Sequence, residues 1–166
     1  MTTRVLIPSG ALGLNYDQVA LDRGIAMKPD IIAIDGGSTD SGPAYLGRGV
    51  SKYSRASTKI EWCGLMEARA KAGVPLVIGT SGTCGADDTV NWMLDITREI
   101  ATDLRQSLKI AVLRCSQDTA VMRKAFCDGH ITPLPAAPNV TASDFATCTN
   151  IVALAGAEQI VAALKT

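Results

Sequence analysis

Four short apolar runs separated by helix-like segments constrain the fold of this chain more than any other feature. The apolar runs occupy residues 4–7, 31–34, 75–78 and 108–113. Segments with apolar residues at helical spacing occupy residues 15–27, 58–72, 88–104 and 118–127. Continuous apolar strands that alternate with amphipathic helices indicate parallel strands covered on both faces. The pattern predicts a doubly wound α/β fold, with a mainly parallel sheet and helices on both faces.

The length of 166 residues suits one domain with a real core, and 47% of the residues are hydrophobic. We find no internal repeat and no low-complexity linker, so residues 1–166 are expected to form a single α/β domain. Residues 140–166 are expected to be helical in two pieces. A last helix with no strand after it suggests a fragment or a split subunit, or simply a terminal helix.

Charge, hydropathy and cysteine content argue against several classes of protein. Sixteen Lys and Arg residues balance sixteen Asp and Glu residues, so a nucleic-acid binder of the basic-patch kind is not expected. No apolar run approaches the roughly 20 residues of a membrane helix, and the N-terminus lacks a signal-peptide pattern. The five cysteines include no C-x-x-C pair, so we expect small buried thiols in a reducing compartment, the cytoplasm.

Small polar residues follow every predicted strand, and they are the strongest sign of a site. In open parallel sheets, ligands bind beyond the carboxyl ends of the strands. The opposite edge of the predicted sheet has no such cluster. The polar strand ends are Ser9-Gly10 and residues 35–42, 80–88 and 115–118.

The loop after the second strand is longer than the 2–6 residues that such a connection usually has. It could be a long turn, but its glycines also let backbone N–H groups approach a ligand. Asp35 and Asp40 could bind a divalent cation, orient a hydroxyl group or act as acid and base. The candidate ligand-binding residues of this loop are Gly36, Gly37, Ser38, Thr39 and Ser41.

The turn after the third strand precedes a helix, whose free N–H groups favour an anion. It does not match a phosphate loop or G-x-G-x-x-G. Asp87 or Asp88 is expected to be the N-cap. Cys84 is a candidate nucleophile because a helix start stabilises a thiolate, although no base is near it in the sequence. The candidate binding residues of this turn are Thr80, Ser81, Gly82 and Thr83.

The remaining candidates lie on other segments. Ser9 ends the first strand, and Ser116 follows the fourth, where Ser116 or Asp118 could instead cap the next helix. His130, the only histidine, follows Asp128-Gly129 in a loop, where it could be catalytic or exposed and idle. Trp62 and Trp92 are expected in the core, because they lie at helical spacing among apolar neighbours.

Several of these segments together resemble the acyclic terpene utilisation (AtuA-like) family. The most specific is Asp30-Ile31-Ile32-Ala33-Ile34-Asp35-Gly36-Gly37-Ser38-Thr39-Asp40-Ser41-Gly42-Pro43. Residues 73–83 look like the second glycine-rich segment of that family, Trp92 and residues 95–100 resemble its helix, and residues 116–118 match in part. The resemblance extends over nearly the whole chain. Family members are usually longer, and Ser116 stands where an acidic residue is often found.

The resemblance implies the N-terminal part, or one subunit, of a catabolic enzyme that acts on a small organic acid or its coenzyme A thioester. Hydrolase, lyase and hydratase chemistry remain open. The rival hypothesis is a non-catalytic ligand-binding module, or a subunit that completes the active site of a second chain.

The C-terminal segment predicts assembly, because it is apolar on most sides whereas a surface helix usually has one apolar stripe. We therefore expect a homo-oligomer or a complex with another chain, with this segment at the contact. The apolar residues are Ile151, Val152, Leu154, Ala155, Ile160, Val161, Ala163 and Leu164.

Overall fold

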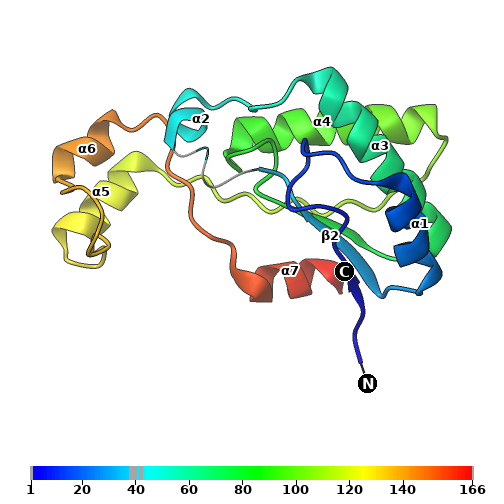
Figure 1. The fold of residues 1–166 in the computed structure, drawn as a ribbon. Coiled ribbons are helices and arrows are strands. Elements are labelled where there is room, and N and C mark those ends of the chain that lie inside the picture. Colours follow the sequence, from blue (N-terminus) through cyan, green and yellow to red (C-terminus); the bar gives the residue numbers. More distant parts are fainter. Residues whose placement is uncertain (1, 38–40, 42, 166) are drawn as a thin grey trace.

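The computed structural model describes residues 2–37, 41 and 43–165, and within them it is an α/β fold (Figure 1). The strands are β1 (Val5–Leu6), β2 (Ile31–Asp35) and β3 (Leu76–Gly79). The helices of the described residues are α1 (Gln18–Ala26), α2 (Pro43–Arg48), α3 (Arg55–Ala72), α4 (Asp87–Asp103), α5 (Thr119–Cys127), α6 (Ala142–Thr147) and α7 (Gly156–Leu164).

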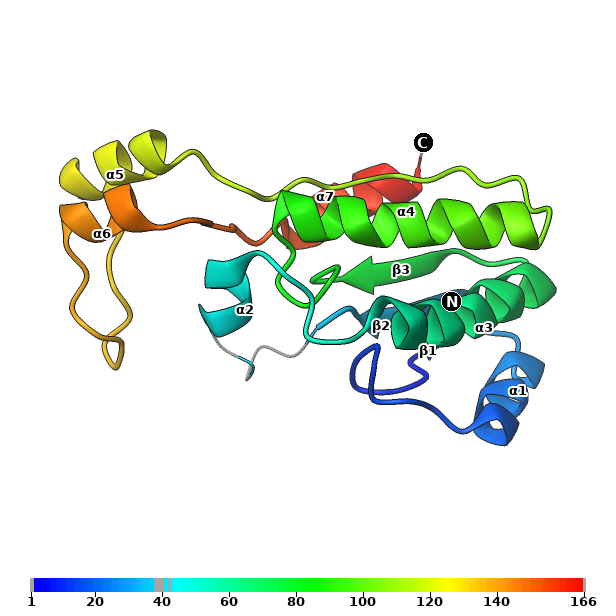
Figure 2. The ribbon, with the colours of Figure 1, turned by 90° about the horizontal axis from the view of Figure 1, so that it is seen from above.

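The three described strands form one parallel sheet in the order β1-β2-β3. Val5 pairs with Ile31, and residues 32–35 of β2 pair with residues 76–79 of β3. A right-handed crossover from each strand to its next neighbour places every connecting helix on the same face of the sheet. Accordingly, α1, α3 and α4 lie on one side of the sheet (Figures 1 and 2).

The core lies between this helical layer and the sheet. Alternate side chains of a strand point to opposite faces, and Ile32 and Ile34 of β2 are the buried pair. They pack in one cluster with Leu65 of α3 and with Ile96 and Ile100 of α4. Ile31, Ala33 and Asp35 point to the other face and are only half-buried. The hydrophobic core is therefore one-sided.

Residues at the helix ends explain where most helices begin and end. The carboxylate of Asp17 accepts a hydrogen bond from the N–H of Ala20, and Asp118 caps α5 through the N–H of Val121. Gly73 ends α3 in the left-handed conformation, with φ +68°. The expected N-cap at Asp87 or Asp88 is wrong, because Ala86 precedes α4 and both aspartates lie in its first turn.

The predicted strand at residues 108–113 is absent from the described structure. This segment runs onward from the end of α4 outside the described sheet, and Ile110 and Val112 are exposed. Just beyond it, the backbone pairs with the C-terminal segment instead. The N–H of Gln117 donates to the carbonyl of Ile151 at 2.8 Å, and that of Ala153 donates to the carbonyl of Cys115 at 2.9 Å.

Residues 140–166 contain two helical pieces, α6 and α7, as expected, but they lie in different places. α5 and α6 pack on each other, with the rings of Phe126 and Phe145 5.1 Å apart, and stand away from the rest of the molecule (Figures 1 and 2). α7 lies on the side of the sheet opposite α3 and α4. The short helix α2 was not expected from the sequence, because its residues belong to a long polar segment.

The five cysteines are free, but none of them is buried, so the expectation of buried thiols is wrong. Cys63, Cys84 and Cys115 are half-buried, and Cys127 and Cys148 are exposed near the ends of α5 and α6, which bury no residue. Partial burial, with Glu67 as a smaller cause, raises the pKa of the Cys63 thiol. Within the described residues, no helix combines the length and the apolar character needed to cross a membrane.

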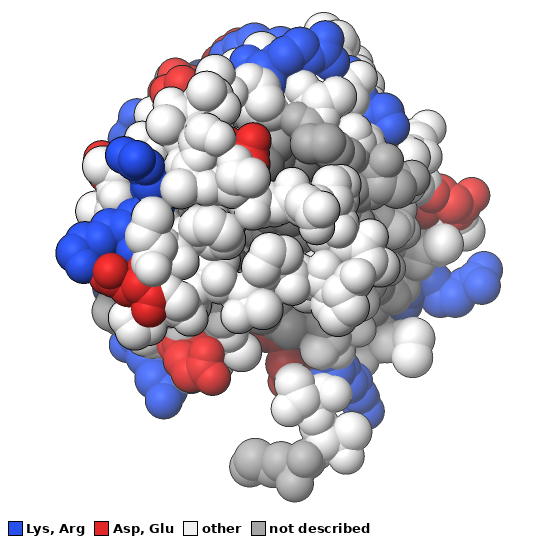
Figure 3. Space-filling view, turned by 90° about the vertical axis from the view of Figure 1, so that its left-hand side faces the viewer, with Lys and Arg blue, Asp and Glu red and all other residues white. Residues whose placement is uncertain are grey.

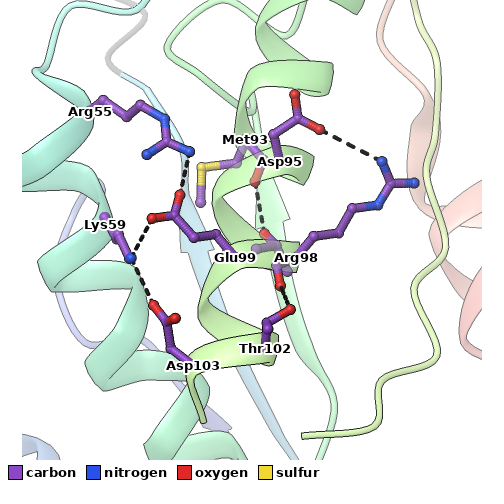
Figure 4. A network of polar contacts seen from close by, with 9 residues as sticks. Arg55, Lys59, Met93, Asp95, Arg98, Glu99, Thr102 and Asp103 are labelled. Atoms are coloured by element: carbon purple, nitrogen blue, oxygen red, sulfur yellow. Dashed lines mark hydrogen bonds and ion pairs between the residues drawn. The ribbon is translucent and has the colours of Figure 1, made fainter. Parts of the chain in front are cut away.

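A chain of ion pairs joins the outer surfaces of α3 and α4 (Figure 4). Glu99 accepts a hydrogen bond from Arg55 and another from Lys59, each at 2.6 Å, and Lys59 also reaches Asp103 at 2.8 Å. The hydrogen bonds from Lys59 and Arg55 lower the pKa of Glu99. Those to Asp103 and Glu99 raise the pKa of Lys59. These ion pairs therefore connect two helices that also contribute side chains to the same core.

Replacing Leu65 with Ala is expected to lower the free energy of unfolding by about 2–5 kcal/mol, because a fully buried side chain leaves a cavity. Ile60 lies on the same helix but is 75% exposed, so Ile60→Ala is the matched control and should change stability by less than about 0.5 kcal/mol. Urea denaturation measures both. Equal losses would contradict the described core.

Glu99→Gln is expected to lower the melting temperature at pH 7, because the variant loses a carboxylate that two cations hold ionised. A carboxyl group whose pKa is lowered in the folded state stabilises the fold above its ordinary pKa, here 4.5. The difference between the two proteins should therefore shrink as the pH falls below that value and vanish below the folded-state pKa. Thermal unfolding followed by circular dichroism over this pH range tests the expectation, and a constant difference would contradict it.

Candidate functional site

The loops that follow β1, β2 and β3 contact one another at the carboxyl end of the sheet. The N–H of Leu12, in the loop after β1, donates to the carbonyl of Asp35 at 2.8 Å. The N–H of Thr83, in the turn after β3, donates to the carbonyl of Gly36 at 3.1 Å. Because parallel strands end at one edge, three of the predicted polar strand ends are brought together here.

Gly36 and Gly37 form the closest contact between two of these loops. A Cβ atom on Gly37 would lie 2.1 Å from the carbonyl oxygen of Thr83, and one on Gly36 would lie 2.5 Å from that of Gly79. The N–H of Gly36 donates to the carbonyl of Gly79 at 2.6 Å, and the N–H of Gly37 donates to the Asp35 carboxylate at 3.1 Å. Both glycines are therefore needed for loop packing, and their N–H groups are engaged within the protein.

The turn from Thr80 to Cys84 holds an unusual backbone conformation. Thr80 and Thr83 have φ values of +42° and +82°, which β-branched residues rarely adopt. Such strain costs about 1–3 kcal/mol per residue and is concentrated at functional sites. The hydroxyl group of buried Thr83 accepts a hydrogen bond from the N–H of Lys52 at 3.0 Å and lies 3.4 Å from the Ser51 hydroxyl group. These contacts hold the turn in place.

Other candidates lie in this turn or beside it. Asp35 is half-buried at the end of β2, and the hydroxyl group of Ser9 donates to the carbonyl of Ala11 at 2.8 Å. The carbonyl of Ser81 accepts a hydrogen bond from the Thr89 hydroxyl group at 3.0 Å. The Cys84 sulfur lies 3.4 Å from the same hydroxyl group. Gly82 is also buried against Thr89, with φ +67°.

Lys52 is a site residue that the sequence analysis missed. Its ammonium group donates to the Ser41 hydroxyl group at 3.1 Å, while its backbone binds Thr83. It therefore places a cationic group beside the loop that follows β2, while its backbone is held by the turn that follows β3. A single lysine in a polar stretch carries no local signal, because its position depends on how α2 and the following loop fold back.

A hollow of about 340 Å³ lies beside Lys52, between the start of α3 and the first turns of α4. The aromatic rings of Tyr53 and Trp92 and the side chain of Val50 give it apolar walls, and Ser51, Arg55 and Asp88 add polar groups. Trp92 is half-buried, so it contacts the core and also lines this hollow. Trp62 is buried in the core, as expected, and donates from its indole to Thr97 at 2.9 Å.

Glu61 is a buried acidic residue that fixes the loop after β1. Its carboxylate accepts a hydrogen bond from the N–H of Gly13 at 2.7 Å. Its backbone carbonyl accepts one from the Tyr16 hydroxyl group at 2.9 Å. Burial, with the nearby charge of Glu61 as a smaller cause, raises the pKa of Tyr16. The sequence signal for Glu61 was an acidic residue next to Trp62 on the core side of a helix.

The remaining candidates are placed differently. Ser38, Thr39 and Asp40 lie outside the described residues. Ser116 lies at the first turn of α4, where its hydroxyl group accepts a hydrogen bond from the N–H of Asp87 at 3.0 Å. His130 is exposed at the end of α5, apart from the strand-end loops. In the part of the chain that is described, no group of three His, Cys, Asp or Glu side chains could hold a metal ion.

Comparison with known proteins gives no match: no family model fits the chain, and neither the curated proteins nor the solved structures contain a significantly similar one.

Gly37→Ala is expected to lower the free energy of unfolding by at least about 1–3 kcal/mol, because the new methyl group meets the backbone of Thr83. Gly79→Ala is the matched control, since no atom lies within 4 Å of a Cβ atom there. Chemical denaturation compares the two variants. If Gly37→Ala were as stable as Gly79→Ala, the described contact between the loops would be wrong.

Proposed function

We propose that this protein is an enzyme, or the catalytic subunit of one, that acts on a small organic acid or its coenzyme A thioester. The observation that carries the proposal is the position of Lys52. Its backbone is fixed to the turn after β3, and its ammonium group lies against Ser41 and over the ring of Tyr53, which lines a hollow with apolar walls. A carboxylate needs a cation, and an acyl chain needs apolar surface. Both are present at the edge of the sheet where ligands bind in α/β proteins.

In the mechanism that we favour, Lys52 binds the substrate carboxylate through a charge-assisted hydrogen bond. The acyl chain occupies the hollow against Tyr53 and Trp92. We propose Asp35 as the acid or base for a part of the substrate that extends past the strand end. Its half-buried carboxylate stands at the end of β2, on the sheet face opposite the hollow, and has the Gly37 N–H as its hydrogen-bond donor. The strained Thr80–Thr83 turn supports a functional role for this edge. Hydrolase, lyase and hydratase reactions are all compatible with these groups.

The predictions for Ser38, Thr39 and Asp40 stay predictions, as does a divalent cation held by Asp35 and Asp40. We also propose that the chain is related to the AtuA-like family and acts in the cytoplasm. Its sheet would be doubly wound, with α7 covering part of the second face. This last point is supported by the position of α7 on the side of the sheet opposite α3 and α4 (Figure 1).

A specific observation favours the alternative, a non-catalytic ligand-binding or partner subunit. The N–H groups of Gly36, Gly37 and Thr83 all donate within the protein, so they do not form a ready oxyanion hole. A chain of this kind would bind an organic acid through Lys52 without transforming it, or would complete the active site of a second chain.

Lys52→Met is expected to weaken the binding of an organic acid or acyl-CoA by about 10- to 100-fold, because a hydrogen bond to a charged group contributes about 1.5–3 kcal/mol. Calorimetric titration with a panel of short-chain acids and their thioesters measures this effect. Lys71→Met, on an exposed lysine near the end of α3, is the matched control. Unchanged binding in Lys52→Met would overturn the proposed site.

Asp35→Asn is expected to lower kcat by about 100-fold or more while leaving binding largely intact, because it removes the proton acceptor. Thioester cleavage and hydration are followed by free-thiol release and by the absorbance of the unsaturated acyl group. Full activity in a correctly folded variant would exclude Asp35 as the acid or base. Binding without turnover in the wild-type protein would favour the non-catalytic alternative.

A further inference from the structure

The helices α5 and α6 and the connection between them form a unit, residues 119–147, which we call the arm. In the described structure, the arm does not pack against the core of the molecule. Both helices bury no residue, and their main contact is with each other. The arm extends beyond the carboxyl end of the sheet and is joined to the rest of the molecule by two extended segments (Figures 1 and 2). At its base, the side chain of Asn150 donates to the carbonyl of Leu46 at 2.8 Å.

Such an arm cannot be stable on its own interactions. Its helices have 9 and 6 residues, and isolated helices shorter than about 12–15 residues are marginal in water. Val121, on α5, is 63% exposed, and Leu134, in the connection, is 77% exposed. The helical structure of the arm therefore needs another surface that covers these apolar side chains.

The rest of the molecule offers a complementary surface, which we call the open face, on the side of the sheet that carries α7. A hollow of about 250 Å³ lies here, between residues 112–117 and the segment before α7. Its apolar lining includes Val112, Leu113, Leu154 and Ala155, of which Leu154 is fully exposed, and Arg114, Gln117 and Gln159 add polar groups at its walls. α7 buries no residue, although most of its side chains are apolar. Large exposed apolar side chains that gather in one place mark an interaction surface.

The total exposed area shows how much surface is left to cover. The chain exposes 10367 Å². A compact monomer of its mass, 17.4 kDa, exposes about 7,800 Å². The excess of about 2,500 Å² per chain is as large as the area that each subunit buries in an obligate homodimer.

We propose that the open face binds the arm of a second copy of this chain, so that two copies exchange arms reciprocally. Each chain carries one arm that does not pack against the core and one open face with exposed apolar side chains. A two-fold symmetric dimer buries both at once. Because the net charge is zero, no net electrostatic repulsion opposes the approach of two identical chains. The end of the molecule that bears the arm presents mostly uncharged side chains, with Lys, Arg, Asp and Glu toward the rim (Figure 3). This inference does not depend on the proposed catalytic function.

Sedimentation and light scattering of the full chain should give twice the mass of 17.4 kDa at micromolar concentration. Val121→Asp, on the arm, and Leu154→Asp, on the open face, should each weaken dimerisation at least about tenfold, because each places a charge in an apolar contact. Ile60→Asp is the matched control: it changes an exposed apolar residue on α3, on the other side of the molecule, and should leave the mass unchanged. Circular dichroism verifies that the variants fold.

Mixing the two variants distinguishes arm exchange from a simple contact between two α7 helices. In a mixed pair, the unchanged arm of the Leu154→Asp chain meets the unchanged open face of the Val121→Asp chain, so dimers should partly return. A monomeric wild-type protein would overturn the proposal. So would a dimer that Leu154→Asp dissociates but Val121→Asp leaves intact, or a mixture of the two variants that forms no dimers. If a variant does not fold, hydrogen exchange of wild-type residues 119–127 decides: protection must rise with protein concentration.

Discussion

The handedness of the crossover between neighbouring parallel strands determines most of this structure. With the strands in the order β1-β2-β3, right-handed connections place α1 and α3 on one face of the sheet, and α4 packs beside α3 on the same side. The core therefore forms around Ile32 and Ile34, which point toward this layer. The other face receives only α7, and that helix buries none of its residues. The weakly covered second face is a consequence of this constraint.

The same parallel arrangement assembles the candidate site, because it brings the strand-end loops to one edge. Their contact depends on the absence of a side chain at Gly36 and Gly37, which allows the backbone of Thr83 to approach. Once the turn after β3 is held there, its Thr83 hydroxyl group fixes the backbone of Lys52. Buried Glu61 anchors the loop after β1 in a similar way, through the N–H of Gly13. The polar groups of the site are thus positioned mainly by backbone contacts.

The sequence predicted the local elements well wherever a periodic pattern and a capping residue agreed. Gly73 and Asp118 ended and began helices as expected, and β2 and β3 matched their apolar runs. The prediction failed for residues 108–113, whose apolar pattern fits a strand but whose neighbouring segment pairs with residues 151–153 instead. It also failed for the cysteines, because thiol burial depends on which helices find a body to pack on.

For the site, the sequence alone identified the polar strand ends, since the ends of parallel strands must share an edge. It could not identify Lys52 or Glu61, because their roles depend on contacts between residues 31 and 48 positions apart in the chain. It offered His130 either as catalytic or as exposed and idle, and the structure leaves it exposed at the end of α5. Local hydrophobic periodicity and glycine placement are written in the sequence and determine the elements and their order. Tertiary packing alone decided which loops meet and which apolar faces stay exposed. Those contacts join segments far apart in the chain, and no local pattern in either segment indicates its partner.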